Sequence, residues 1–167
     1  RFDTDNFFAM GFSMGGTIDK LYFDDLSRYE VGDPQVAEVL KEAEVHFDYE
    51  VEDVVRKDSL RLTEADRELL RQRIAASPLR LALVTHGTDT MVDTGHALKG
   101  IPGKVIVLTG ALSPYRFRQS DATFNIGCAI GALQVLPPGV YIAMSGRVFA
   151  IDHVRKNREG RRFEEIP

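Results

Sequence analysis

Two short segments of the sequence combine glycines with hydroxyl and carboxylate side chains, a combination typical of a small-molecule site. The first reads Gly15-Gly16-Thr17-Ile18-Asp19-Lys20, and its two glycines let the backbone approach a ligand closely. The second reads Thr85-His86-Gly87-Thr88-Asp89-Thr90-Met91, and the N–H groups of the helix expected after it suit a carboxylate. Each segment alone is more often a tight turn or a helix cap, so it is their occurrence together that predicts a site.

The elements around these segments must place them side by side. Strand-like and helix-like stretches alternate, which indicates βαβ units and a mainly parallel sheet. We expect strands at 7–13, 45–51, 81–84, 104–108 and 140–144, with a short hairpin arm at 148–150. We expect a helix capped by Asp33 with Pro34 in its first turn, helices over 63–76, 91–99 and 120–135, and a short one near Asp152.

This alternation predicts an α/β fold of three layers. Its centre is a doubly wound, mainly parallel sheet of about five strands, flavodoxin-like or Rossmann-like, with helices on both faces. The loops that follow parallel strands share one edge of such a sheet, and ligands bind outside the carboxyl ends of the strands. Segments 15–20, 85–90 and 110–119 are therefore expected to meet.

Composition excludes several other classes of protein. The formal net charge of −4 argues against a generic nucleic-acid binder, and no apolar run is long enough to span a membrane. Asp3 and Asp5 stand where a signal peptide would be basic. Cys128 is the single cysteine, which favours a reducing, cytoplasmic compartment. We expect no cofactor, and no metal, because metal-ligand spacing is absent from His46, His96 and His153.

The two threonine segments resemble the two signatures of the bacterial-type L-asparaginase/glutaminase family. Supporting matches to that family's third strand-loop segment are Thr109-Gly110-Ala111, Ser120-Asp121 and Asn125. The resemblance runs over nearly the whole chain in the expected order. It implies an amidohydrolase that converts L-asparagine to L-aspartate and ammonia through a threonine acyl-enzyme.

The resemblance also implies roles for individual residues. Thr17 matches the threonine nucleophile, and the second catalytic group is matched by Thr88, Asp89 and Lys156. Tyr22 is the counterpart of a tyrosine on the flexible loop. The substrate-binding residues implied are Gly16, Asp58, Ser59, Gly87, Thr88 and Asp89. The residues themselves leave open whether Thr17 or Thr88 is the nucleophile, and whether Tyr22 or Tyr115 reaches the substrate.

A threonine hydroxyl is a weak nucleophile at neutral pH and needs help from its neighbours. Lys156 would lower the proton affinity of Thr88 if it is buried, and Asp89 would orient that lysine and receive the substrate's α-ammonium. Backbone N–H groups near Gly16 or Thr88 would stabilise the tetrahedral oxyanion.

The sequence departs from the family in two ways. Met14 replaces a threonine before the first motif, and it is either a neutral core filler or a residue that mistunes the Thr17 loop. Family members are also about twice as long. The resemblance is therefore to short-chain asparaginases: residues 1–167 would form a single N-terminal-type catalytic domain, with the family's C-terminal domain absent. A homodimer or homotetramer would then complete the site, with weak affinity for asparagine and little glutaminase activity.

Other interpretations compete with hydrolysis. In one alternative, the protein binds small amino acids at the same site without catalysis. In another, it transfers the amide nitrogen as ammonia to a partner within a larger complex. The basic stretch 155–162 is expected to be a solvated terminus that presents Lys156, since no aromatic platform for nucleic acid interleaves it. His86 is expected to be structural, and the thiol of Cys128 buried and inert.

Overall fold

The computed structural model describes residues 8–23 and 28–167, and its centre is a six-stranded sheet in the order β4-β1-β5-β6-β7-β8. Neighbouring strands from β4 to β7 are parallel, and β8 pairs antiparallel with β7. The bounds of these strands are β1 Phe8–Gly15, β4 Asp48–Lys57, β5 Leu81–Thr85, β6 Val105–Thr109, β7 Gly139–Met144 and β8 Arg147–Ala150. The order of the five parallel strands is that of a flavodoxin-like doubly wound sheet.

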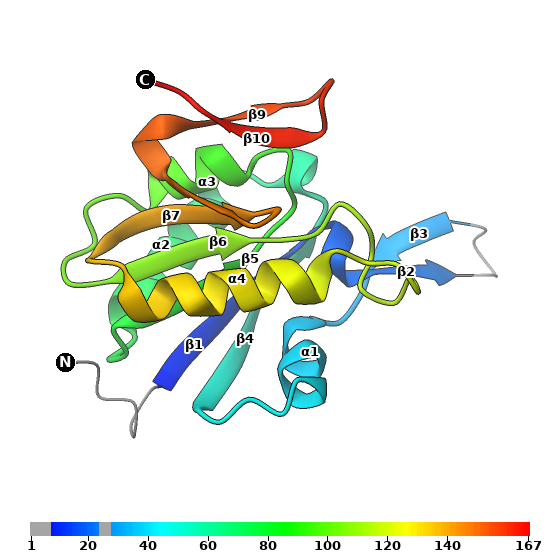
Figure 1. The fold of residues 1–167 in the computed structure, drawn as a ribbon, viewed down its shortest axis with the longest axis horizontal. Coiled ribbons are helices and arrows are strands. Elements are labelled where there is room, and N and C mark those ends of the chain that lie inside the picture. The colour runs from blue at the N-terminus through cyan, green and yellow to red at the C-terminus, as the bar shows by residue number, and fades with distance from the viewer. Residues whose placement is uncertain (1–7, 24–27) are drawn as a thin grey trace.

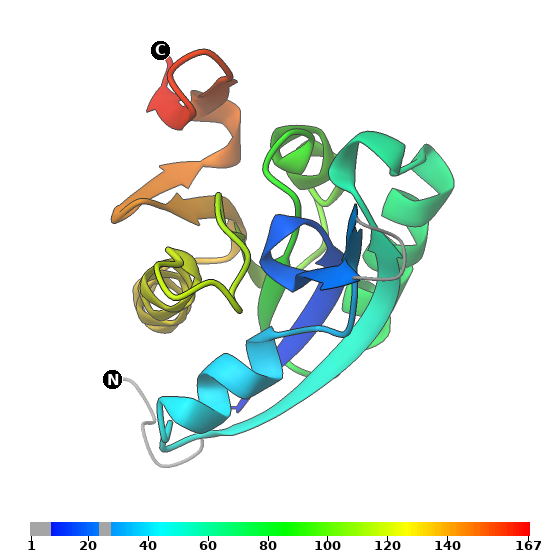
Figure 2. The ribbon, with the colours of Figure 1, turned by 90° about the vertical axis from the view of Figure 1, so that its right-hand side faces the viewer.

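Helices cover both faces of the sheet, which confirms the three-layer prediction (Figures 1 and 2). One face packs against α1 (Val36–Glu42) and α4 (Ala122–Val135), and the other against α2 (Glu64–Ala76) and α3 (Met91–Ala97). β5 and β6 are buried along their whole length because both of their faces are covered. Short 3₁₀ turns occupy Thr17–Asp19, Ser59–Arg61 and Ile151–His153.

Two small hairpins lie outside the main sheet, and neither was predicted from the sequence. β2 (Lys20–Phe23) pairs with β3 (Arg28–Val31), and β9 (Val154–Asn157) pairs with β10 (Arg162–Glu165). In Figure 1, the first hairpin extends from the sheet edge and the second lies above α3. Each is a two-stranded ribbon of four-residue strands, too short to show a clear alternation of apolar and polar residues.

Local cap signals predicted some element ends correctly and others wrongly. Thr63 and Asp66 form the expected capping box at α2. Asp33 does not cap α1, contrary to the prediction: the cap position is Gln35, and its N–H donates to the Asp19 carboxylate at 2.8 Å. The first strand runs on to Gly15, and β4 begins at Asp48 instead of Val45. Phe7, Asp3 and Asp5 lie outside the described residues.

A core substitution tests the α2 side of the fold. Leu70 is fully buried in α2, so Leu70→Ala should lower the free energy of unfolding by about 2–5 kcal/mol through lost burial and a new cavity. Leu60 is 64% exposed, and Leu60→Ala should cost no more than about 0.5 kcal/mol. Urea unfolding measures both. Equal losses in the two variants would contradict the packing described here.

No helix in the described ranges 8–23 and 28–167 has both the length and the apolar character needed to cross a membrane.

Candidate active site

The loops after β1, β5 and β6 meet in the structure, as the sequence predicts. A Cβ atom on Gly16 would lie 2.4 Å from the backbone nitrogen of Gly87, so these two loops are in direct backbone contact. A Cβ on Gly110 would lie 2.2 Å from the carbonyl oxygen of His86. β1 and β5 are the strands between which the winding of the sheet reverses, and a ligand crevice opens at this point in doubly wound folds.

Lys156 joins the second threonine segment from far along the chain. Its Nζ donates to Thr88 Oγ1 at 2.7 Å and to Asp89 Oδ1 at 2.6 Å. The lysine side chain is 12% exposed, whereas that of Asp89 is 37% exposed and faces solvent in part. The three side chains thus form a lysine-centred cluster of the kind that the sequence analysis expected.

The β9–β10 hairpin delivers this lysine. Val154 and Phe163 are buried in the core and fix the hairpin against the sheet side that carries α3. Hydrogen bonds from the side chains of Asn157, Arg162 and Arg155 lower the pKa of Glu164 on β10 to about 2. The arginines of the stretch 155–162 are exposed and Lys156 faces the cluster, as expected of a solvated stretch that presents this lysine. The hairpin that the stretch helps to form was not predicted.

Thr17 begins the 3₁₀ turn directly after Gly16 and is half-buried. Gly16 has φ 92° and ψ −172°, a backbone conformation available in practice only to glycine. Its N–H donates to the carbonyl oxygen of Lys57 at 3.0 Å. The N–H of Gly16 itself is therefore not a free oxyanion donor, whereas the neighbouring N–H groups and those near Thr88 remain candidates.

Ser59 and Asp58 precede α2 and adjoin the second threonine segment. Ser59 is buried, and its Oγ lies 2.8 Å from where a Cβ on Gly87 would be. Thr90 Oγ1 donates to the Ser59 carbonyl at 2.8 Å, which ties the two segments together. Asp58 instead forms an ion pair with Lys20 at 3.0 Å. Burial acts to raise the pKa of Asp58, but hydrogen bonds from Lys20 and the Leu60 amide outweigh it, and the pKa is lowered.

Tyr22 and Tyr115 were the two candidates for contact with the substrate. In the part of the chain that the structure describes, neither is hydrogen-bonded to the lysine cluster. Tyr22 lies on β2 with 53% of its surface exposed, and its ring packs on Tyr29 at 5.2 Å between centroids. Tyr29 in turn contacts Phe117, edge to face, at 5.7 Å. The hydroxyl of Tyr115 donates to Glu42 on α1, and this bond raises the pKa of Tyr115 to about 12.

His86 is a structural residue, as expected. Its Nδ1–H donates to the Gly87 carbonyl at 2.6 Å, and its Nε2 accepts from Thr94 Oγ1 at 2.7 Å. Complete burial lowers the pKa of His86 to about 4, so the ring is neutral at pH 7. Arg67 donates to the same Thr94 oxygen at 3.0 Å, so His86, Thr94 and Arg67 form a buried hydrogen-bonded group next to the second threonine segment.

The third loop is held by an asparagine and an aspartate. Asn125 is fully buried in α4, donates to the Gly110 carbonyl at 2.9 Å, and accepts from the Ser145 amide at 3.0 Å. The Asp121 carboxylate accepts from the amides of Leu112 and Ser113. Asn125 and Asp121, which support the family resemblance, therefore have a structural role, because they anchor segment 110–119.

The remaining predictions about single residues have mixed outcomes. Met14 is fully buried in the core shared with α2 and α3, consistent with its interpretation as a core filler. Cys128 is a free thiol that is only partly buried, so the prediction of a buried thiol was too strong. Within residues 8–23 and 28–167, no group of three or more histidine, cysteine or acidic residues is placed to hold a metal ion.

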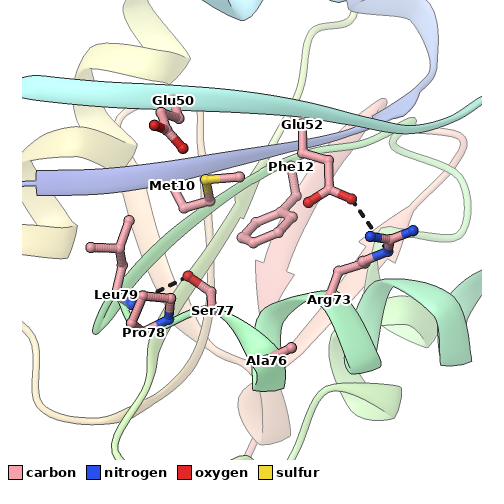
Figure 3. A pocket seen from close by; sticks show the side chains of 9 residues that line it. All are labelled: Met10, Phe12, Glu50, Glu52, Arg73, Ala76, Ser77, Pro78 and Leu79. Carbon is pink, nitrogen blue, oxygen red and sulfur yellow. Dashed lines mark hydrogen bonds and ion pairs between the residues drawn. The ribbon is translucent and has the colours of Figure 1, made fainter.

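A separate hollow of about 420 Å³ lies beside the residues that lead into β5, away from the strand ends that carry the threonine segments. Figure 3 shows Met10 and Phe12 on one side of it, with Glu52 paired to Arg73 at 3.3 Å. It shares no residue with the lysine cluster.

The fold and the cluster together define a doubly wound α/β domain, with threonine, lysine and aspartate side chains close to the sheet edge at which ligands bind in such folds. A family model described as the N-terminal domain of asparaginase matches residues 10–163, so the chain belongs to this family. A curated relative, an L-asparaginase from Thermococcus kodakarensis, is 34% identical over 77 residues, which cover 44% of this chain and 24% of that protein.

Solved structures agree with this assignment. The thermostable L-asparaginase from Thermococcus kodakarensis superposes with a TM-score of 0.83 at 24% identity, over 96% of this chain and 51% of that one. L-asparaginase I from Vibrio cholerae gives 0.81 at 25% identity, over 96% and 51%. A probable cytoplasmic L-asparaginase from Campylobacter jejuni gives 0.67 at 21%, over 89% and 48%. The chain spans about half the length of these structures.

Proposed function

We propose that the protein hydrolyses the side-chain amide of L-asparagine to L-aspartate and ammonia. The observation that carries this proposal is the contact of one lysine nitrogen with Thr88 and Asp89, at 2.7 and 2.6 Å. Membership of the asparaginase family supports the choice of substrate. The site combines a hydroxyl group and an amine that can transfer protons, which serve amide hydrolysis, with a carboxylate that can accept the ammonium group of an amino-acid substrate.

In this mechanism, Thr17 Oγ1 attacks the amide carbon of the substrate and forms a tetrahedral intermediate. The proton of the Thr17 hydroxyl passes to the Thr88–Lys156 pair and then to the leaving nitrogen, so that the C–N bond breaks and ammonia departs neutral. Water then attacks the acyl-threonine ester, and aspartate is released with the threonine hydroxyl restored. The direct contact of the Gly16 and Gly87 backbones supports a shared site for the two threonine segments.

The groups of the substrate that do not react also have candidate partners. The Asp89 carboxylate is partly exposed and would receive the α-ammonium group. Ser59 and Gly87, which are in contact, would hold the α-carboxylate. Asp58 is a weaker candidate because it is paired with Lys20. Tyr22, which is exposed on β2, is a further candidate for contact with the substrate.

Two alanine variants test the assignment of the nucleophile. We expect Thr17→Ala to lower the rate of ammonia release by about 10⁴-fold or more and to abolish acyl-enzyme formation, because the ester can no longer form. We expect Thr88→Ala to slow both acylation and deacylation while a labelled acyl group can still be trapped on Thr17. Mass spectrometry of quenched enzyme distinguishes the two. An acyl group found on Thr88 in the wild type would reverse the roles.

The substrate preference is tested by measuring ammonia release from L-asparagine, L-glutamine and their D-forms. We expect little turnover of glutamine. Ammonia from none of them, with asparagine still bound in calorimetry, would favour the non-catalytic binder. No described observation favours that binder, because Met14, which motivated it, is a core residue.

We infer a cytoplasmic protein from the single cysteine, with one catalytic domain in residues 1–167. We also infer a homodimer or homotetramer, which sedimentation equilibrium would detect.

A further inference from the structure

Asp19 is a buried acid in the turn that carries Thr17, and the proposed mechanism does not use it. It is 1% exposed and lies two residues after the proposed nucleophile. One carboxylate oxygen accepts from Ser13 Oγ, at the end of β1, at 3.1 Å. The other accepts from the backbone N–H of Gln35, just before α1, at 2.8 Å. The carboxylate therefore bridges a core strand and a helix.

The backbone of Asp19 belongs to the same arrangement. Its N–H donates to the Gly16 carbonyl at 3.2 Å, and its carbonyl accepts from the Gly32 amide, just after β3, at 2.8 Å. Side chain and backbone thus connect the Thr17 turn to β1, to the end of the β2–β3 hairpin and to α1. Three of these four bonds join the turn to other elements, and the fourth, to the Gly16 carbonyl, closes the turn itself.

We propose that Asp19 is the positioning residue of the Thr17 turn, and that its bonds to Ser13 and Gln35 hold the Thr17 hydroxyl in place for attack. This inference rests on the proposed function for its effect on turnover, but not for its effect on the turn itself. A displacement of about 1 Å at a reacting group is enough to cost about 100-fold in rate, so a rigid tether next to the nucleophile matters.

The charges around Asp19 are few. From β4, Asp53 raises the pKa of the Asp19 carboxyl and Arg56 lowers it, and Ser13 and Gln35 contribute hydrogen bonds only. Arg116, in the segment before α4, reaches the side chain of Gln35 at 3.3 Å. Lys20, the next residue in the chain, forms its ion pair with Asp58 and not with Asp19. Burial is the main cause that raises the pKa of Asp19 to about 7.

Three variants test the proposal. Asp19→Ala removes both side-chain bonds, whereas Asp19→Asn keeps an oxygen for the Gln35 amide and an amide group that can donate to Ser13 Oγ. Asp53→Asn is the matched control, because it makes the same charge change in the same neighbourhood while Asp53 bonds to Arg56 instead. All three are compared with wild-type protein in ammonia release and in amide hydrogen exchange.

We expect Asp19→Ala to lower kcat for asparagine by about 10- to 100-fold with KM changed by less than about threefold, because Asp89 and Ser59 are untouched. Asp19→Asn should restore kcat to within about threefold of wild type, and Asp53→Asn should match wild type. An unchanged kcat in Asp19→Ala, at a temperature where it is folded, would overturn the proposal.

Amide hydrogen exchange measures the rigidity of the Thr17 turn independently of catalytic turnover. In Asp19→Ala, the amides of Gln35 and Gly32 should both exchange about tenfold faster or more, while β5 and β6 remain protected. Faster exchange at Gln35 alone would mean that only the helix start is loosened, and it would count against a positioned turn. If wild-type protein releases no ammonia from any substrate, the proposed function fails, and this measurement still decides whether Asp19 holds the turn.

The pH dependence of unfolding gives a third readout. An acid whose native pKa is raised binds its proton more tightly when folded, so its contribution to stability is present below pH 3.8 and is lost as pH rises to about 7. The wild-type folding equilibrium constant should therefore fall relative to that of Asp19→Asn across this window and run parallel to it above. Parallel behaviour at all pH values would contradict the raised pKa of Asp19.

Discussion

Replacing Lys156 with methionine should lower the rate of ammonia release from L-asparagine by about 10³-fold, within the range that a single proton-transfer group supplies. Methionine fills a similar volume but carries no nitrogen, so Thr88 Oγ1 and Asp89 Oδ1 both lose their partner. The loss should fall mainly on kcat. Asp89 remains available for the substrate ammonium, so KM should change much less.

Lys99→Met is the matched control for this variant. Lys99 also pairs with an aspartate, Asp152, at 2.6 Å, but its side chain is 48% exposed, against 12% for Lys156. An exposed ion pair contributes about 1 kcal/mol at most, so Lys99→Met should keep wild-type turnover. A folded Lys156→Met variant with activity within about tenfold of wild type would rule out the proposed role of the lysine.

Replacing Gly16 with alanine should both destabilise the protein and remove its activity. The new Cβ would lie 2.4 Å from the Gly87 nitrogen and 2.5 Å from the Gly87 Cα, so the first and second loops must separate. Alanine is also strained at the Gly16 φ of 92° and ψ of −172°. We expect a loss of about 3–5 kcal/mol in the free energy of unfolding, measured in urea, together with a fall in turnover of more than about 100-fold.

Gly100→Ala separates the two causes. Gly100 also has a positive φ, of 82°, but a Cβ there would meet nothing within 4 Å. It should therefore cost about 1–2 kcal/mol of stability from backbone strain alone and leave turnover unchanged. If the two variants lost equal stability and kept equal activity, the close approach of Gly16 to Gly87 would have no functional meaning.

Features that rest on neighbours in the sequence were predictable. The capping box of Thr63 and Asp66 is closed within one helical turn, and the buried runs of β5 and β6 are continuous apolar stretches, so each carries its own signal. Parallel strands then force their following loops to one edge, which is why the meeting of the Gly16 and Gly87 loops also followed from the alternation of elements.

Features that rest on distant partners were not predictable from local patterns. Asp33 satisfies every local rule for a helix cap, yet Asp19, 16 residues before Gln35, accepts the Gln35 amide instead. The β9–β10 hairpin was missed because its strands are short, and it is anchored by Val154 and Phe163 against a core made by other segments.

The sequence by itself therefore determined the family resemblance, the layered α/β fold and the identity of the chemical groups, because motifs and hydrophobic periodicity are local properties. Only the tertiary structure decided which groups meet: Lys156 contacts Thr88, 68 positions away, and the N–H of Gly16 donates to the Lys57 carbonyl. It also decided that Asp19 is buried, with no cation bonded to it among residues 8–23 and 28–167. Hydrogen-bond partners and burial depend on the packing of segments far apart in the chain, and no local pattern records that packing.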